Sequence, residues 1–164
     1  MKVISKQTNS KMCIICGVEN RLGLKGDFYN MEDGSVGATF TFKPEHQSYP
    51  ERVHGGMISA LLDELAGRAL WVTDPQLMGV TTTMTVKFRK PVPYETKLIG
   101  RGYITKRSGR LFSAKAQIFD QNKNVLAEIE GNYIILPNEQ IASKENLNDE
   151  VSIIVPDDVT EIDF

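Results

Sequence analysis

Cysteine and histidine are scarce in this 164-residue sequence, which limits the metal and redox chemistry that it can support. The two cysteines, Cys13 and Cys16, form a single C-x-x-C pair, and the two histidines, His46 and His54, lack a finger-like spacing. A structural zinc site usually takes four such ligands, so we predict no metal site. A redox-active pair is expected beside a βαβ pattern, which is missing here. We therefore interpret the cysteines as small residues that pack an N-terminal lead-in.

Long apolar runs and a large excess of one charge are also missing. No stretch approaches the roughly 18 apolar residues of a transmembrane helix, and no signal-like apolar run follows Lys2 and Lys6. The net charge of −2 gives no general attraction for nucleic acid or an anionic membrane. We therefore expect a cytoplasmic protein that binds neither, and any site for an anion must be a local patch.

What is present suits one globular domain. The 41% hydrophobic and 24% charged shares are ordinary for a soluble chain. A chain of this length buries roughly 68–70% of its unfolded surface, so its core needs no staples. We divide the sequence into an N-terminal arm (1–26), a central domain (27–136) and an acidic C-terminal extension (137–164).

The apolar pattern predicts one helix and several strands. Residues 35–42 alternate between apolar and polar side chains, as in a strand with one buried face. An apolar arc with helical spacing predicts a helix over 55–71. Further strands are expected at 28–31, 79–88, 97–106, 110–120 and 124–136, and 151–155 could add an edge strand. Short turns join the later strands, which favours an α+β fold in which a curved antiparallel sheet of five or six strands wraps one long helix.

The start of this helix carries the most informative residues. Gly55 and Gly56 leave backbone N–H groups of the first turn open to close approach by a ligand, so these groups can stabilise an oxyanion. Asp63 lies two turns further along, on a stripe of small residues, where a carboxylate can act as a general base or a nucleophile. A tight helix start and a solvated acidic face explain the same residues, so the residues alone leave both interpretations open.

Two neighbouring side chains are less promising candidates. Glu64 is the rival acid, but its spacing to Arg68 predicts an i, i+4 pair at a surface or an interface. His54 could contact substrate or brace the loop before the helix, and we favour bracing because no partner for catalysis is visible.

The run His54-Gly55-Gly56, with Asp63 nine residues after the histidine, resembles the motif of the hotdog-fold acyl-CoA thioesterases, specifically the phenylacetate-degradation (PaaI-like) branch. The resemblance covers residues 28–136 and makes 27–136 a hotdog thioesterase domain. It is also carried by 88–93, by the hairpin at 107–110 and by 122–130. The lead-in around the two cysteines is similar to that of some members.

The resemblance implies a role for several residues. The Gly55 N–H would hold the thioester carbonyl oxygen, and Asp63 would activate water or attack directly. Thr81, eighteen residues after the acid, would orient the water, although simple alternation turns it to the wrong face unless the strand carries a bulge. Ser48 stands where relatives often have asparagine or glutamine. The site would form across a homodimer, with Gly55 and Asp63 from different chains, and such dimers often pair into tetramers.

The resemblance implies no cofactor, because coenzyme A is part of the substrate. Lysine or arginine at the mouth of a cleft would hold its phosphates through charge-assisted hydrogen bonds. The candidates at strand ends and a hairpin are Arg89, Lys90, Lys106, Arg107 and Arg110. An ordinary solvated turn explains them equally well. An acyl-CoA-binding hotdog protein without catalysis is the alternative function.

Overall fold

The computed structural model describes residues 1–164, with only the side chain of Lys144 outside the description. Seven strands, one long helix and four short helical segments make up the chain. In order they are β1 (Val3–Lys6), β2 (Asp27–Met31), β3 (Val36–Thr41), η1 (Pro44–His46), α1 (Gly55–Gly67), η2 (Arg68–Val72), β4 (Met78–Phe88), β5 (Lys97–Ser108), β6 (Leu111–Phe119), β7 (Val125–Leu136), α2 (Asn138–Ile141) and α3 (Lys144–Glu150).

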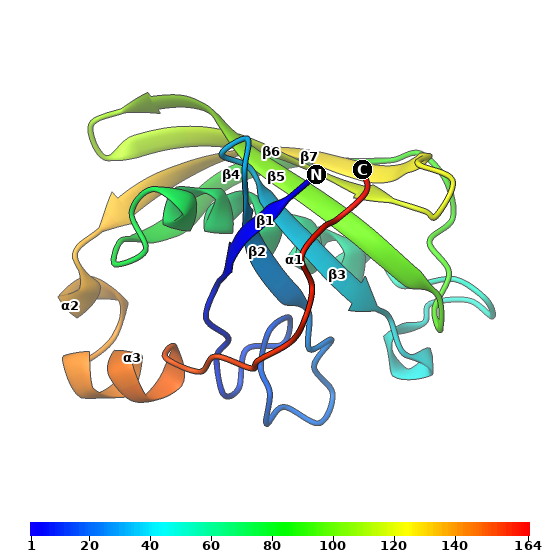
Figure 1. The fold of residues 1–164 in the computed structure, drawn as a ribbon, viewed down its shortest axis with the longest axis horizontal. Helices are drawn as coiled ribbons and strands as arrows, with labels where there is room; N and C mark the ends of the chain where they lie inside the picture. Colours follow the sequence, from blue (N-terminus) through cyan, green and yellow to red (C-terminus); the bar gives the residue numbers. More distant parts are fainter.

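The strands form one antiparallel sheet in the order β1-β2-β3-β5-β6-β7-β4, which curves around α1 (Figure 1). This is the predicted α+β hotdog architecture. The sheet has seven strands rather than five or six because β1, in the expected irregular arm, pairs with β2. β4 stands at the opposite edge and pairs with β7.

The core lies between α1 and the concave face of the sheet. The predicted apolar arc of the helix is buried, with Leu61, Leu62 and Leu65 fully enclosed. Burying side chains of this size contributes roughly 1.5–3 kcal/mol each. Gly102 allows the helix to lie close to β5. Any larger residue would clash there, since a Cβ on Gly102 would come within 2.5 Å of the Leu65 carbonyl oxygen. The α-helix ends at Gly67, and a 3₁₀ turn continues to Val72.

The two terminal segments run side by side on the outside of the sheet (Figure 1). Isolated bridges join Lys2 to Glu161 and Asn9 to Ile153. The edge strand considered at 151–155 is therefore reduced to a single bridge at Ile153. No helix among the described residues is long and apolar enough to cross a membrane.

Candidate active site

Asp63 is held by two hydroxyl groups from neighbouring strands. Thr81 Oγ1 on β4 donates to Asp63 Oδ1 at 2.8 Å, and Tyr133 Oη on β7 donates to the same oxygen at 3.1 Å. Among the described groups, none donates a hydrogen bond to Oδ2. The carboxylate is therefore oriented through one oxygen, while the other is available to a water or a substrate.

A β-bulge turns Thr81 towards the helix. Thr81 pairs with Tyr133 and Thr83 pairs with Asn132, so Thr82 is an extra residue in the register of β4. The bulge corrects the simple alternation that would have placed Thr81 on the outer face. The predicted proximity of Thr81 to Asp63 is therefore explained by one inserted residue.

Tyr133 was missed in the sequence analysis as a site residue. Its ring stacks on Phe112 with the centroids 4.8 Å apart, and Gly131 leaves it room, because a Cβ there would come within 2.7 Å of the ring. Burial, reinforced by the charge of Asp63 and the hydrogen bond to it, raises the pKa of Tyr133. The phenol therefore stays protonated and donates. The signal in the sequence was a tyrosine at an inward strand position, where a hydroxyl needs a partner.

The cavity around Asp63 has a volume of about 260 Å³. Its inner wall contains Thr81 and Tyr133. Its outer wall comes from the two ends of the chain, with Cys13 in the arm and Ile141 and Leu147 in the C-terminal extension. The terminal segments therefore cover the side of α1 that carries Asp63.

The first turn of α1 leaves one N–H group without a protein acceptor. His54 caps the helix, and its Nδ1 accepts from the Gly56 N–H at 2.9 Å. The N–H groups of Met57 and Ile58 donate to the His54 carbonyl oxygen. Among the described groups, none accepts from the Gly55 N–H. His54 therefore caps α1, and the Gly55 N–H is available to a ligand. Whether His54 also contacts substrate is not decided by this cap, so bracing stays a prediction.

Gly55 opens onto a second cavity, of about 400 Å³. Ser48 lies in its wall, together with Phe88, Arg89 and Lys90. The structure thus brings Ser48, Gly55 and two of the predicted phosphate ligands together at one end of the molecule. Arg89 also forms an ion pair of 2.5 Å with Glu128.

The thioesterase superfamily family model matches residues 51–127, from the loop before α1 into β7. This part of the chain is similar to the thioesterase superfamily. Among solved structures, a thioesterase superfamily protein is 28% identical over 73% of this chain, with a TM-score of 0.67. This chain covers only 58% of that protein.

Two further thioesterase-like structures share the fold at lower identity. The Escherichia coli PaaI protein of the phenylacetic acid degradation operon is 19% identical, with a TM-score of 0.63, over 70% of this chain and 81% of its own. A Haemophilus influenzae thioesterase is 13% identical, with a TM-score of 0.64, over 74% of this chain and 85% of its own. Among curated protein sequences, no match to this chain was found.

Within one chain, Gly55 and Asp63 do not share a cavity. They lie eight residues apart on α1, roughly 12 Å along its axis. Gly55 lines the larger cavity, and Asp63 lines the smaller one. A single chain therefore presents the two predicted halves of a thioesterase site at separate places.

The five basic candidates are divided in the same way. The backbone N–H of Arg89 donates to the Leu126 carbonyl oxygen near the start of β7. The backbone carbonyl oxygen of Arg110 accepts from the Ile135 N–H near the end of the same strand. Nine residues of strand separate these points, or roughly 30 Å. Arg107 pairs with Asp74 at 2.5 Å. Lys106, Arg107 and Arg110 therefore lie far from Arg89 and Lys90 in one chain.

Glu64 pairs with Arg68 as predicted, but the arginine of this pair is buried. Arg68 Nε donates to Glu64 Oε1 at 2.7 Å, and Arg68 is only 3% exposed. Its guanidinium lies over the rings of Phe28 and Trp71, 4.3 and 4.6 Å from their centroids. Burial acts to lower the pKa of Arg68, but the charges of Glu64 and Cys16 outweigh it and raise that pKa. The N-terminal arm covers Arg68, whose Nη1 donates to the Thr8 carbonyl oxygen, so the expected surface position is wrong for Arg68, whereas the Glu64 side chain stays 26% exposed. The alternative of an interface pair stays a prediction.

Proposed function

We propose that the protein is a thioesterase that hydrolyses an acyl-CoA or acyl carrier thioester to a free acid and a thiol, with Asp63 as general base or nucleophile. The observation that carries the proposal is the Asp63 carboxylate itself. Thr81 and Tyr133 both donate to Oδ1, no described group donates to Oδ2, and Asp63 lines a cavity. A carboxylate fixed in this way can take a proton from water without first reorganising.

The reaction needs a donor for the carbonyl oxygen as well as a base. As Asp63 takes a proton, the water oxygen bonds to the thioester carbon, and negative charge develops on the carbonyl oxygen. The Gly55 N–H, at the positive end of the helix dipole, stabilises that oxyanion. The C–S bond then breaks, and the thiolate leaves and is protonated. In the nucleophilic route, Asp63 Oδ2 bonds to the carbonyl carbon first, the C–S bond breaks, and the thiolate leaves and is protonated. Water then cleaves the resulting anhydride into the free acid and the Asp63 carboxylate.

The two groups meet in a homodimer that pairs the β4 strands edge to edge. β4 is an edge strand, and it exposes the apolar side chains of Val80, Met84 and Phe88. Antiparallel pairing would set the start of one β4 against the end of its partner. The start carries Thr81 of the Asp63 cavity, and the end carries Phe88 of the Gly55 cavity. Gly55 of one chain and Asp63 of the other then complete each site, and two such dimers form the proposed tetramer.

The same pairing reunites the divided basic residues. Arg89 and Lys90 of one chain would lie at the same end of the joined sheet as Lys106, Arg107 and Arg110 of the other. Together they form a mouth for the phosphates of coenzyme A, which lysine and arginine bind through charge-assisted hydrogen bonds. No cofactor is required, because every group that reacts belongs to the chain or to the substrate.

The alternative is a hotdog protein that binds acyl-CoA without cleaving it. Binding alone does not require a carboxylate beside a thioester, whereas hydrolysis does. The oriented Asp63 therefore favours the enzyme.

A thiol-release assay across short, medium, long and aromatic acyl-CoAs, and one acyl carrier thioester, tests the proposal. Asp63→Asn should lower kcat by roughly 10²–10⁴, the usual contribution of a positioned base. Asp149→Asn, which changes an exposed acid on α3, is the matched control and should keep wild-type turnover. Unchanged turnover in folded Asp63→Asn protein would remove Asp63 from the mechanism. Tight binding of a non-hydrolysable analogue with no thiol release from any substrate would establish the alternative function.

A further inference from the structure

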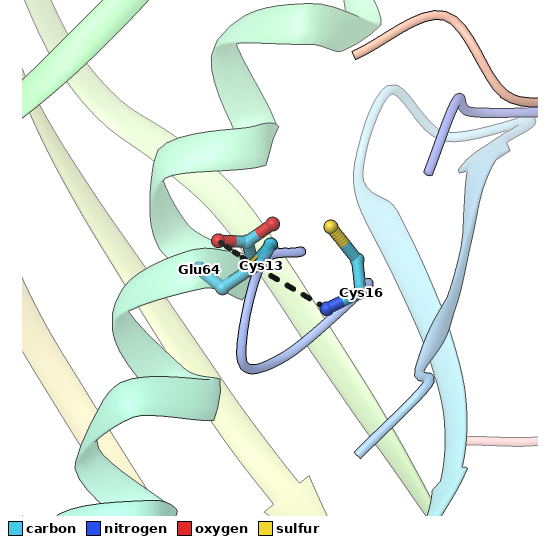
Figure 2. A group of neighbouring side chains, drawn as sticks. All are labelled: Cys13, Cys16 and Glu64. Atoms are coloured by element: carbon cyan, nitrogen blue, oxygen red, sulfur yellow. Dashed lines mark hydrogen bonds between the residues drawn. The ribbon is translucent and has the colours of Figure 1, made fainter. Parts of the chain in front are cut away.

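The C-x-x-C pair of the arm faces an acid on α1. The sulfur atoms of Cys13 and Cys16 and a carboxylate oxygen of Glu64 all lie within 4.8 Å of one another (Figure 2). The helix supplies a third ligand-type atom that the spacing of the cysteines did not reveal. Sulfur and carboxylate oxygen are both common zinc ligands.

The turn that carries the cysteines is built around the Cys13 sulfur. Its Sγ accepts from the backbone N–H groups of Ile15 at 3.3 Å and Cys16 at 3.4 Å. Gly17 completes the turn, because a Cβ there would come within 2.3 Å of the Cys13 carbonyl oxygen. The turn therefore presents both sulfurs from one short loop.

Glu64 is oriented towards the sulfurs by the buried Arg68. Arg68 Nε holds Oε1 at 2.7 Å, and Oε2 lies 3.9 Å from Cys13 Sγ. Such a partner, which fixes a ligand while leaving its other oxygen available, is typical of the second shell of a metal site. Arg68 is itself held by its contacts with two aromatic rings and by a hydrogen bond to the Thr8 carbonyl oxygen, so the carboxylate has little freedom to turn away.

Distance and charge both fit a divalent ion at this position. In a tetrahedral site with zinc–sulfur and zinc–oxygen bonds of about 2.3 and 2.1 Å, the two ligand atoms stand about 3.6 Å apart. The observed 3.9 Å between Cys13 Sγ and Glu64 Oε2 is close to this separation. Two thiolates, one carboxylate and the Arg68 guanidinium sum to −2, which a divalent cation neutralises.

We propose that Cys13, Cys16 and Glu64 bind one thiophilic divalent metal ion of the zinc class. Cys13 and Glu64 also line the Asp63 cavity, so the fourth coordination position faces that cavity and takes water or a ligand. The ion ties the N-terminal arm to α1 at the residue next to Asp63. The proposal departs from our expectation of no metal site, and it holds whether or not Asp63 hydrolyses a thioester.

Metal analysis of the reduced, chelator-free protein after zinc loading and desalting tests the proposal. We expect about one zinc per chain, because the proposal gives each chain one complete ligand set. Cobalt loading of the same protein should give the intense thiolate-to-cobalt charge-transfer absorption of a sulfur-ligated site. Cys16→Ser and Cys13→Ser should weaken zinc affinity by more than about 100-fold, since loss of an outer-shell partner alone costs about 10–100-fold. Glu64→Gln should also weaken it, whereas Glu19→Gln, which changes an exposed acid in the same arm, should not.

Three results would overturn the proposal. The first is zinc far below one per chain. The second is bound cobalt without the charge-transfer absorption, a result on the wild-type chain that is independent of how the variants fold. The third is two thiols that react equally fast with a thiol reagent in the presence and absence of zinc. A Cys13–Cys16 disulfide formed in preference to metal binding, seen as the loss of two hydrogens by mass spectrometry, would identify a redox pair instead.

Discussion

The two ends of α1 differ in how fully the chain prepares them. At the Asp63 end, two hydroxyls fix a carboxylate in a cavity of about 260 Å³ under the arm and the C-terminal extension. At the Gly55 end, a helix N–H has no acceptor among the described groups, and the cavity of about 400 Å³ is bordered by exposed Phe88, Arg89 and Lys90. The first end is complete within one chain, and the second lacks a counterpart. This contrast supports a site shared between two chains.

Removing the Gly55 N–H should have the largest effect on catalysis among changes at the Gly55 end of α1. Gly55→Pro deletes this donor at the first helical position, where proline is tolerated. The preceding residue, His54, already has the extended dihedrals that a following proline requires. We expect kcat for thioester hydrolysis to fall by roughly 10²–10³, as for loss of one oxyanion donor. Gly55→Ala keeps the N–H and is the matched control. Equal kcat in the proline and alanine variants would exclude Gly55 as the oxyanion donor.

Loss of one hydroxyl at the Asp63 end of α1 should lower kcat by a smaller factor. Thr81→Val or Tyr133→Phe removes one of two donors to Asp63 Oδ1, and a hydrogen bond to a charged group contributes about 1.5–3 kcal/mol. We expect each to lower kcat by roughly 10–100-fold while KM changes little. Thr82→Val is the control, because the Thr82 hydroxyl donates to the Asn132 carbonyl oxygen instead. If Thr82→Val is as damaging as Thr81→Val, the bulge rather than the hydroxyl is what matters.

The basic residues in the wall of the Gly55 cavity should affect the binding of acyl-CoA. Lys90→Ala should raise KM for acyl-CoA by roughly 2–5-fold with kcat unchanged, since an exposed charge pair contributes at most about 1 kcal/mol. The effect should shrink at high salt and should vanish with an acyl-pantetheine substrate, which has no nucleotide phosphates. Lys97→Ala, at the start of β5, serves as the control. A KM effect that persists with acyl-pantetheine would place Lys90 against another part of the substrate.

The smallest effect on catalysis is expected at His54. His54→Ala removes the acceptor for the Gly56 N–H and should lower the free energy of unfolding by about 1 kcal/mol, measured by urea denaturation. His54→Asn should recover most of this stability, because asparagine caps helices well. Both variants should turn over thioester at close to the wild-type rate. A large loss of kcat in the asparagine variant would show that the imidazole contacts substrate.

Much of the fold could be predicted because its signals are local. The apolar arc of α1 determines one buried face, and the structure confirms it. The alternation of 35–42 predicted a strand, which the structure confirms as β3, but Ser35 and Gly37 on the expected polar face are buried as well. β1 could not be predicted, because four residues that pair only with β2 have no periodic pattern of their own. The expected edge strand at 151–155 failed for the related reason that α3 extends to Glu150.

The site was predictable only where one element contains it. Asp63 and Gly55 stand on one helix, so their spacing was visible in the sequence. Tyr133 reaches Asp63 from 70 residues away through the register of β7, and Thr81 reaches it through a bulge that alternation does not reveal. The approach of Cys13 to Glu64 likewise depends on how the arm packs. Such contacts arise from tertiary packing, which local sequence patterns do not predict.

Mixing two inactive variants tests the shared site most directly. Asp63→Asn and Gly55→Pro subunits, combined at equal concentration under conditions that allow exchange, should form mixed dimers with one intact and one doubly defective site. Random exchange makes about half of the dimers mixed, so turnover should rise from near zero to about a quarter of wild type. Recovery to that level would establish that Gly55 and Asp63 act from different chains. Mixed dimers, verified by mass spectrometry, that show no recovery would contradict the account.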